Sequence, residues 1–391
     1  MKRALVCCVG IAAFACGPTA PVAAKASPPP VDSPISSPTL SHPVEVLSST
    51  YFHGNGDLTL HLVTISKGLA IDRTILDKQH ASVLDANQRI ALITIDGDTQ
   101  LATLNLDTAA IRALGVSSPS GFGPGVLSPD GTQAAVLARP VDPMTYEILI
   151  VDLGSGAVRH LIQISALAYN RAALDPMRWT ANGILVSPGI WDGGRATLLN
   201  LDPQNGNLNT ITDARFDVLS PSATMMAAAV HANLGDVQYE GQGTWPNRLT
   251  AGPIGPPLAA VVEQKNRAFS ALDITDDGSI LYLADDDPFD TSGGYNKTSP
   301  APDMGIYLAA GGQSIHELGE TYVGQWGAGS LVGSGLALVT KVVVGEAGSA
   351  EIDLVSLCTT SGCNPKVQIV ATISGANPEA RLTLLRPVPA T

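Results

Sequence analysis

The sequence predicts an all-β protein folded as a β-propeller with seven four-stranded blades, and six or eight blades are the alternatives. The chain has 391 residues, of which 39 are glycine, 28 are proline and 45% are hydrophobic, a composition typical of many turns between short apolar strands. Paired hairpins recur about 40 to 55 residues apart, which is the spacing of propeller blades. No segment has a long 3.6-residue period, so βαβ units are disfavoured, and the regular recurrence favours a propeller over an array of β-sandwiches.

Residues 1–15 are expected to be a signal peptide. Lys2 and Arg3 precede an apolar run of about 12 residues, which is too short for a membrane-spanning helix of about 20. The sequence Ala-Phe-Ala-Cys at 13–16 resembles the lipobox of bacterial lipoproteins, in which the chain is cut before the cysteine and lipid is attached to its thiol. The resemblance implies a lipid anchor on Cys16. Secretion of a soluble protein, with cleavage after Ala15 or Ala24, is the alternative.

Residues 16–46 are expected to form a disordered tether. Eight prolines fall between residues 17 and 43, among Ala, Ser and Thr, and such a segment favours extended conformations over a packed core. The propeller would then occupy residues 47–391 and touch a membrane through the anchor only. The expected location is the outer membrane or the periplasm, as an exported lipoprotein.

The clearest blade signal begins with the sequence Ser-Pro-Asp-Gly at 128–131. Proline sets its own φ, aspartate bonds the local backbone and glycine accepts a left-handed conformation, so these residues predict a turn. An apolar strand follows, and a second hairpin turns through the glycine-containing loop at 154–156. Seven second hairpins of this kind are expected, with turns near residues 67, 107, 154, 204, 252, 311 and 361.

The end of the chain is expected to close the ring. Residues 381–385 have the pattern of a strand but no partner nearby in the sequence, and the first hairpin (58–76) lacks a complete preceding hairpin. Placing the last strand in the blade of the N-terminal strands would leave no open sheet edge between the first and last blades.

The turn at 128–131, the strand after it and the sequence Ile-Val-Asp-Leu at 150–153 resemble the TolB-type and WD-like repeats of bacterial periplasmic propellers. The resemblance extends from about residue 45 to the end of the chain. It rests on turn and core residues, so it implies a propeller fold and an envelope setting but no particular activity.

Two cysteines are expected to form a structural disulfide. Cys358 and Cys363 flank a predicted hairpin loop, so their Cα atoms would lie within disulfide range, and an oxidising exported location favours the bond. Zinc binding is the alternative, but the pair has no adjacent histidine. The spacing also differs from the C-x-x-C of redox proteins.

The sequence excludes several classes of chemistry. The net charge of -13 argues against nucleic-acid binding, which needs basic residues to neutralise phosphates. There is no G-x-S-x-G nucleophile motif, no H-E-x-x-H motif and no phosphate-binding glycine-rich loop. The predicted blades fill the chain, so we expect no hydrolase domain of the prolyl oligopeptidase type within it.

One acidic segment is a candidate metal site, and no other cofactor is expected. Asp285, Asp286, Asp287 and Asp290 follow a predicted strand and offer the hard oxygen ligands that Ca²⁺ prefers. Their spacing does not match an EF-hand, and a solvated acidic loop is the structural alternative.

The two longest irregular stretches are candidate binding loops. One carries Tyr239 and Trp245, and the other carries Tyr295 and Asn296. Insertions between propeller strands lie on the faces, where partners bind, and aromatic residues there can anchor a partner or pack beneath the loop.

These observations predict a monomeric, non-catalytic binding or scaffold module at the cell envelope. Its partner would be an envelope protein or a small ligand held on a propeller face. The alternative is a propeller enzyme, such as a metal-assisted lactonase or hydrolase, or a lyase, with its site at the central channel.

Overall fold

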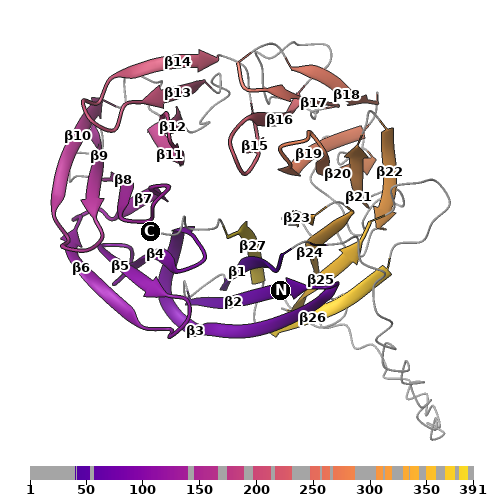
Figure 1. Cartoon of the computed structure of the whole chain (residues 1–391), viewed down its shortest axis with the longest axis horizontal. Coiled ribbons are helices and arrows are strands. Elements are labelled where there is room, and N and C mark those ends of the chain that lie inside the picture. The colour runs from indigo at the N-terminus through magenta and orange to yellow at the C-terminus, as the bar shows by residue number, and fades with distance from the viewer. Residues whose placement is uncertain are drawn as a thin grey trace, which may run out of the picture. The chain divides into compact units, whose positions relative to one another are not determined.

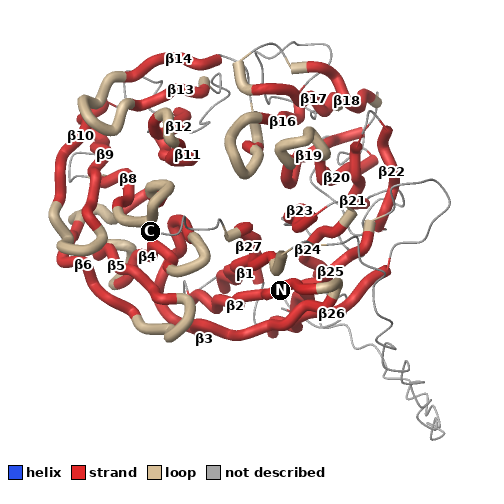
Figure 2. The backbone as a smooth tube through the Cα atoms, viewed as in Figure 1, coloured by secondary structure: helices blue, strands red, loops and turns tan. Residues whose placement is uncertain are grey.

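The structure is a computed structural model that describes the chain from Leu40 to Leu385 with gaps. All described residues belong to one compact unit, Pro34–Thr391, and they form 27 strands and no helix (Figures 1 and 2). The described residues are 40, 42–52, 57–139, 145–165, 174–188, 197–212, 216–230, 247–255, 258–264, 267–286, 305–310, 313–318, 329–333, 335–342, 349–357, 366–374 and 378–385.

The strands form seven four-stranded antiparallel blades around a central axis (Figure 1), which confirms the predicted fold class. Blade 1 consists of β27 (Pro378–Leu384), β1 (Val44–Phe52), β2 (Asp57–Ser66) and the first part of β3 (Leu69–Ala86). Blade 2 consists of the rest of β3, β4 (Ile90–Ile95), β5 (Gln100–Asn105) and β6 (Ile111–Ser117). Blade 3 contains β7 (Phe122–Leu127), β8 (Gln133–Ala138), β9 (Thr145–Asp152) and β10 (Val158–Ser165).

The other four blades repeat this order, with the first strand nearest the axis. Blade 4 contains β11 (Leu174–Thr180), β12 (Gly183–Pro188), β13 (Leu198–Leu201) and β14 (Leu208–Thr212), and blade 5 contains β15 (Val218–Leu219), β16 (Met225–Val230), β17 (Arg248–Pro253) and β18 (Ala259–Glu263). Blade 6 contains β19 (Arg267–Ile274), β20 (Ile280–Asp286), β21 (Gly305–Ala310) and β22 (Gln313–Leu318), and blade 7 contains β23 (Gly329–Gly333), β24 (Leu336–Val342), β25 (Ser349–Ser356) and β26 (Lys366–Ser374).

The last strand closes the ring, as predicted. β27 pairs antiparallel with β1, with Leu384 opposite Val46 and Pro378 opposite Phe52. Blade 1 therefore takes its innermost strand from the C-terminal end of the chain and its other strands from the N-terminal end. β1 begins at Val44, three residues before the boundary expected from the sequence, because Leu40 and Val44 pack against the core between blades 1 and 7.

β3 is one 18-residue strand that serves two blades. It pairs with β2 as far as His80 and with β4 from Ala81 onward. The outermost strand of blade 1 thus becomes the innermost strand of blade 2 without a turn, which ties the two blades into a seven-stranded sheet.

The core lies between the blades, as expected for sheets that pack face to face. Seven clusters of buried apolar residues fill the seven junctions. At the junction of blades 2 and 3, for example, Leu92 and Leu101 pack against Leu127 and Val136. Burial of such side chains contributes about 25 cal/mol for each Å² removed from water.

We call the turn between the first and second strands of a blade its inner turn, and that between the third and fourth strands its outer turn. Inner turns are held by their first side chain: the Ser128 hydroxyl accepts a hydrogen bond from the Gln133 amide (2.9 Å), and Gly131 takes the predicted left-handed conformation (φ 71°). Outer turns bond to inner turns of the same blade through backbone amides, Leu106 to Arg89 (3.0 Å), Leu153 to Thr132 (2.8 Å) and Leu357 to Gly335 (2.7 Å). Both kinds of turn therefore lie on one face of the ring.

Candidate functional site

Three charged side chains occupy equivalent positions on innermost strands of alternate blades. Asp85 of β3, Arg178 of β11 and Asp273 of β19 each follow directly after a β-bulge, one or two residues before the end of the strand that leads into the inner turn. A bulge re-aims the side chain that follows it, and here each charged group reaches the next blade.

These three residues brace neighbouring blades. The Asp85 carboxylate accepts a hydrogen bond from the Leu127 amide (2.8 Å), and the Arg178 guanidinium donates to the Pro221 carbonyl (2.5 Å). The Asp273 carboxylate accepts from the Leu331 amide (2.7 Å) and from the Ser330 hydroxyl (3.1 Å). Blades 2, 4 and 6 are thereby joined to blades 3, 5 and 7, and the residues at the same register position in blades 3 and 5 are Val126 and Val218.

Burial strongly raises the pKa of two carboxyl groups near the axis, those of Asp273 and Asp175. Burial raises the pKa of Asp273 to about 6, against the hydrogen bonds from Leu331, Ile274 and Ser330 and the charge of Arg178, which lower it. Burial likewise raises the pKa of Asp175, on the same strand as Arg178, to about 6, and the charge of Arg139 opposes the shift. Both groups are ionised at neutral pH only at a cost in folding free energy.

The three charged side chains line a cavity at the ring axis. Its volume is about 250 Å³, and Leu219, Ser330 and Thr383 contribute to its walls. Pockets that bind small molecules typically measure about 300 to 1,000 Å³, so this cavity is small for a substrate site. Since its charged groups bond to the backbone of adjacent blades, the geometry fits a brace better than a catalytic centre.

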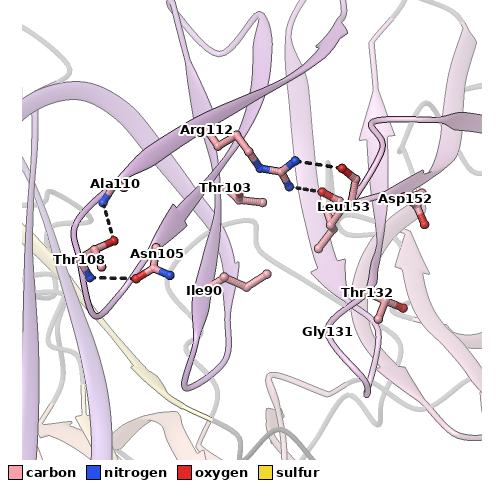
Figure 3. A pocket seen from close by; sticks show the side chains of 11 residues that line it. Ile90, Thr103, Asn105, Thr108, Ala110, Arg112, Gly131, Thr132, Asp152 and Leu153 are labelled. Carbon is pink, nitrogen blue, oxygen red and sulfur yellow. Dashed lines mark hydrogen bonds between the residues drawn. The ribbon is translucent and has the colours of Figure 1, made fainter. Parts of the chain in front are cut away.

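A larger groove lies between blades 2 and 3 (Figure 3). It measures about 640 Å³ and is lined by the outer turn of blade 2 and by both turns of blade 3. The Asn105 side-chain oxygen accepts hydrogen bonds from the amides of Asp107 (3.0 Å) and Thr108 (2.8 Å), and its NH₂ group points into the groove. The groove is a preformed recess of ligand size on the face that carries the turns.

Arg112 spans this groove as one of three equivalent arginine forks, which the sequence analysis missed. Its guanidinium donates to the carbonyls of Leu153 and Gly154 in the outer turn of blade 3, the latter at 3.0 Å (Figure 3). In the same way, Arg73 of blade 1 donates to the carbonyls of Leu106 and Asp107. Arg159 of blade 3 donates to the carbonyls of Pro203 and Gln204. A signal was present in the sequence, because Arg112 and Arg159 each stand seven residues after the last residue of the strand that precedes their own outer turn.

Most of the site residues predicted from the sequence lie outside the described residues: Cys16, Tyr239, Trp245, Asp287, Asp290, Tyr295, Asn296, Cys358 and Cys363. The backbone of Asp285 and Asp286 ends β20, on the face opposite the turns, and their side chains are not described. The part of the chain that is described contains no group of three or more His, Cys, Asp or Glu residues that could hold a metal ion. Within the same residues, no helix is long and apolar enough to cross a membrane.

The two faces of the ring differ in the length of their connections. On the face of the inner and outer turns, no connection between described strands exceeds the nine residues of 357–365. On the opposite face, the segments 231–247 and 287–304 each join the second and third strands of a blade. The predicted binding residues Tyr239, Trp245, Tyr295 and Asn296 belong to these two segments.

Comparison with solved structures supports the fold. Acylaminoacyl peptidase from Pyrococcus horikoshii aligns over 83% of this chain with 9% identity and a TM-score of 0.52, and this chain spans 50% of that protein. A protein from Lactobacillus plantarum aligns over 88% of this chain and all of its own length, with 12% identity and a TM-score of 0.51. A putative TolB from Agrobacterium tumefaciens is also similar, at 10% identity over 71% of this chain and 92% of its own, with a TM-score of 0.41.

At these identities the likeness concerns the fold alone. No protein-family model and no curated protein sequence matches the chain. The protein is therefore a β-propeller by architecture, and it spans about half the length of the peptidase structures that it matches.

Proposed function

We propose that this protein is an exported, lipid-anchored propeller that binds a partner protein at the cell envelope through the face that carries segments 231–247 and 287–304. The observation that carries the proposal is the difference between the two faces. Loops that tolerate insertion on a rigid scaffold are the usual carriers of recognition, and the longest connections between described strands leave from this one face. Their aromatic residues, Tyr239, Trp245 and Tyr295, supply the side-chain types that dominate protein interfaces.

The small axial cavity and the contacts of its charged residues favour a binding function over a catalytic one. The axial cavity is about 250 Å³, and Asp85, Arg178 and Asp273 use their polar atoms to join adjacent blades. An enzyme with its site in the channel would need reactive groups that are available to a substrate. A peptidase activity like that named for the Pyrococcus neighbour is not part of the proposal, because this chain has no nucleophile motif.

The partner interface is tested by cross-linking in envelope membranes. We expect the wild-type protein and the Ala259→Asp variant, which changes an exposed residue outside the long connections, to be cross-linked to one discrete protein. A Trp245→Ala, Tyr295→Ala double variant with an unchanged melting temperature should lose that product. An equal yield from the double variant would overturn the proposed face.

The anchor is tested separately by metabolic labelling with a radioactive fatty acid. Label should enter the wild-type protein and be absent from Cys16→Ser. Equal labelling of both, or no label in either, would remove the anchor from the proposal and leave the binding face to be judged by cross-linking alone.

A further inference from the structure

The outermost strands of four consecutive blades begin with exposed large apolar residues. Among the described residues, all but one of the exposed large apolar side chains belong to this set, and the exception is Met177 at the axis. We call the set the apolar arc: Val367 (43% exposed) and Ile369 (42%) of blade 7, Leu69 (56%) and Ile71 (68%) of blade 1, Ile111 (43%) of blade 2 and Val158 (40%) of blade 3.

The apolar arc follows one rim of the ring. Its residues stand at the start of β26, β3, β6 and β10, which succeed one another around the outside of the ring in Figure 1. Each of these strands starts at an outer turn, and the forks of Arg73, Arg112 and Arg159 join the outer turns of successive blades. The arc therefore lies on the face of the turns, opposite the long connections.

Positive charge accompanies the apolar residues. Lys67, Arg73, Arg112, Arg159 and Lys366 are exposed and lie within two residues of a member of the arc. The arginine forks donate to backbone carbonyls, and Asp72 is the acidic residue that lies within two residues of the arc. Such a grouping is notable in a chain with 22 basic and 35 acidic residues.

The N-terminal end of the described chain emerges at the same rim. Val44, the first residue of β1, pairs with Ile65, next to the outer turn of blade 1. The amide of Leu385, after the last strand, donates to the carbonyl of Glu45 (2.9 Å). A tether that leads from Cys16 to Val44 would therefore meet the ring at the blade whose arc residues are the most exposed.

We propose that the apolar arc rests on an anionic lipid surface. Apolar side chains flanked by Lys and Arg are the combination that inserts into the headgroup boundary of such membranes, where burial and charge attraction add. The groove of Figure 3 opens on the same face, and the NH₂ group of Asn105 within it offers a hydrogen-bond donor to a headgroup oxygen. This orientation would present the long connections of the opposite face to a partner, and it relies on the proposed export of the protein.

The test uses the full chain with Cys16→Ser, so that no acyl chain contributes to binding. Vesicles of phosphatidylethanolamine and phosphatidylglycerol are sedimented with the protein at low salt. We expect Ile71→Asp with Ile111→Asp to weaken partitioning about tenfold, and added salt to weaken it as well. Ala259→Asp, at the exposed start of the outermost strand of blade 5, is the matched control and should leave partitioning unchanged.

Three outcomes would overturn the lipid contact. The first is no partitioning of the parent protein. The second is equal partitioning of the arc variant and the parent, with circular dichroism showing both folded. The third is a dimer in sedimentation equilibrium that the arc variant abolishes, since a second copy of the chain would then cover the arc. Vesicle binding without fatty-acid labelling of the wild type would contradict the anchor alone and leave the arc in place.

Discussion

Replacing Asp273 with asparagine should remove a pH dependence of the ring's stability. Folding raises the pKa of this carboxyl to about 6 from an ordinary value of 3.8, chiefly by burial, so the folded state favours its protonated form. The contribution of Asp273 to stability is therefore full below about pH 4 and is lost as the pH rises through 6. A difference of this size corresponds to about 3 kcal/mol in the free energy of unfolding.

Asparagine has no charge to desolvate, and its side-chain oxygen can still accept the hydrogen bond from the Leu331 amide. Between pH 4 and pH 7, the free energy of unfolding of Asp273→Asn should therefore gain about 2.5 kcal/mol relative to that of the wild type, which is most of the full difference. Asp175 is present in both proteins, so its own titration cancels in the comparison.

The assay is urea unfolding, followed by circular dichroism, at several pH values for both proteins. Asp96→Asn, in an exposed turn between β4 and β5, is the matched control and should follow the wild type. Parallel curves for Asp273→Asn and the wild type would refute the inference that the axial carboxylate is buried at a cost.

Three further predictions concern the closure of the ring, the forks and the turns, and thermal unfolding measures each. Deleting residues 378–391 removes β27 and the apolar packing of its leucines, so the melting temperature should fall by more than about 10 °C, and an unchanged value would contradict the closure. Arg112→Gln should lower the free energy of unfolding by about 1 kcal/mol through lost hydrogen bonds, whereas the exposed Arg89→Gln should lower it by less than about 0.5 kcal/mol. Gly156→Ala should lower the free energy of unfolding by about 2 kcal/mol or more, because φ is 75° there and a Cβ would clash with the Leu114 carbonyl. Gly154→Ala, where a Cβ would make ordinary contacts, should lower it by less.

The fold prediction rested mostly on residues that form turns. The sequence at 128–131 forms the predicted inner turn, with the Asp130 carboxylate accepting hydrogen bonds from Ser128 (2.6 Å) and Thr132 (2.9 Å). Such turns depend on local residues, so their recurrence revealed the repeat. The continuity of β3 was not predicted, because residues 69–86 pass from one blade to the next and only the pairing with β2 and β4 divides them.

The spacing of the arginines from their turns was visible in the sequence, but the partners of the bracing contacts were not. The arginine forks and the axial carboxylates bind backbone atoms of the next blade, 33 to 58 residues away. Every residue carries a backbone carbonyl, so the residue type at the partner position does not reveal the contact. The exposure of the apolar arc was equally hidden, because Ile111 and Val158 have the same residue types as core strands and differ only in lying on the outermost ones.

Our central inference is that the two faces have different roles. The apolar arc contacts lipid, and segments 231–247 and 287–304 bind a partner protein. Hydrogen–deuterium exchange of the full-length protein with and without anionic vesicles tests it most directly. We expect added protection from exchange at the starts of β3, β6, β10 and β26, and none in segments 231–247 and 287–304. Protection of those two segments by lipid, or no change at the starts of the four strands, would contradict it.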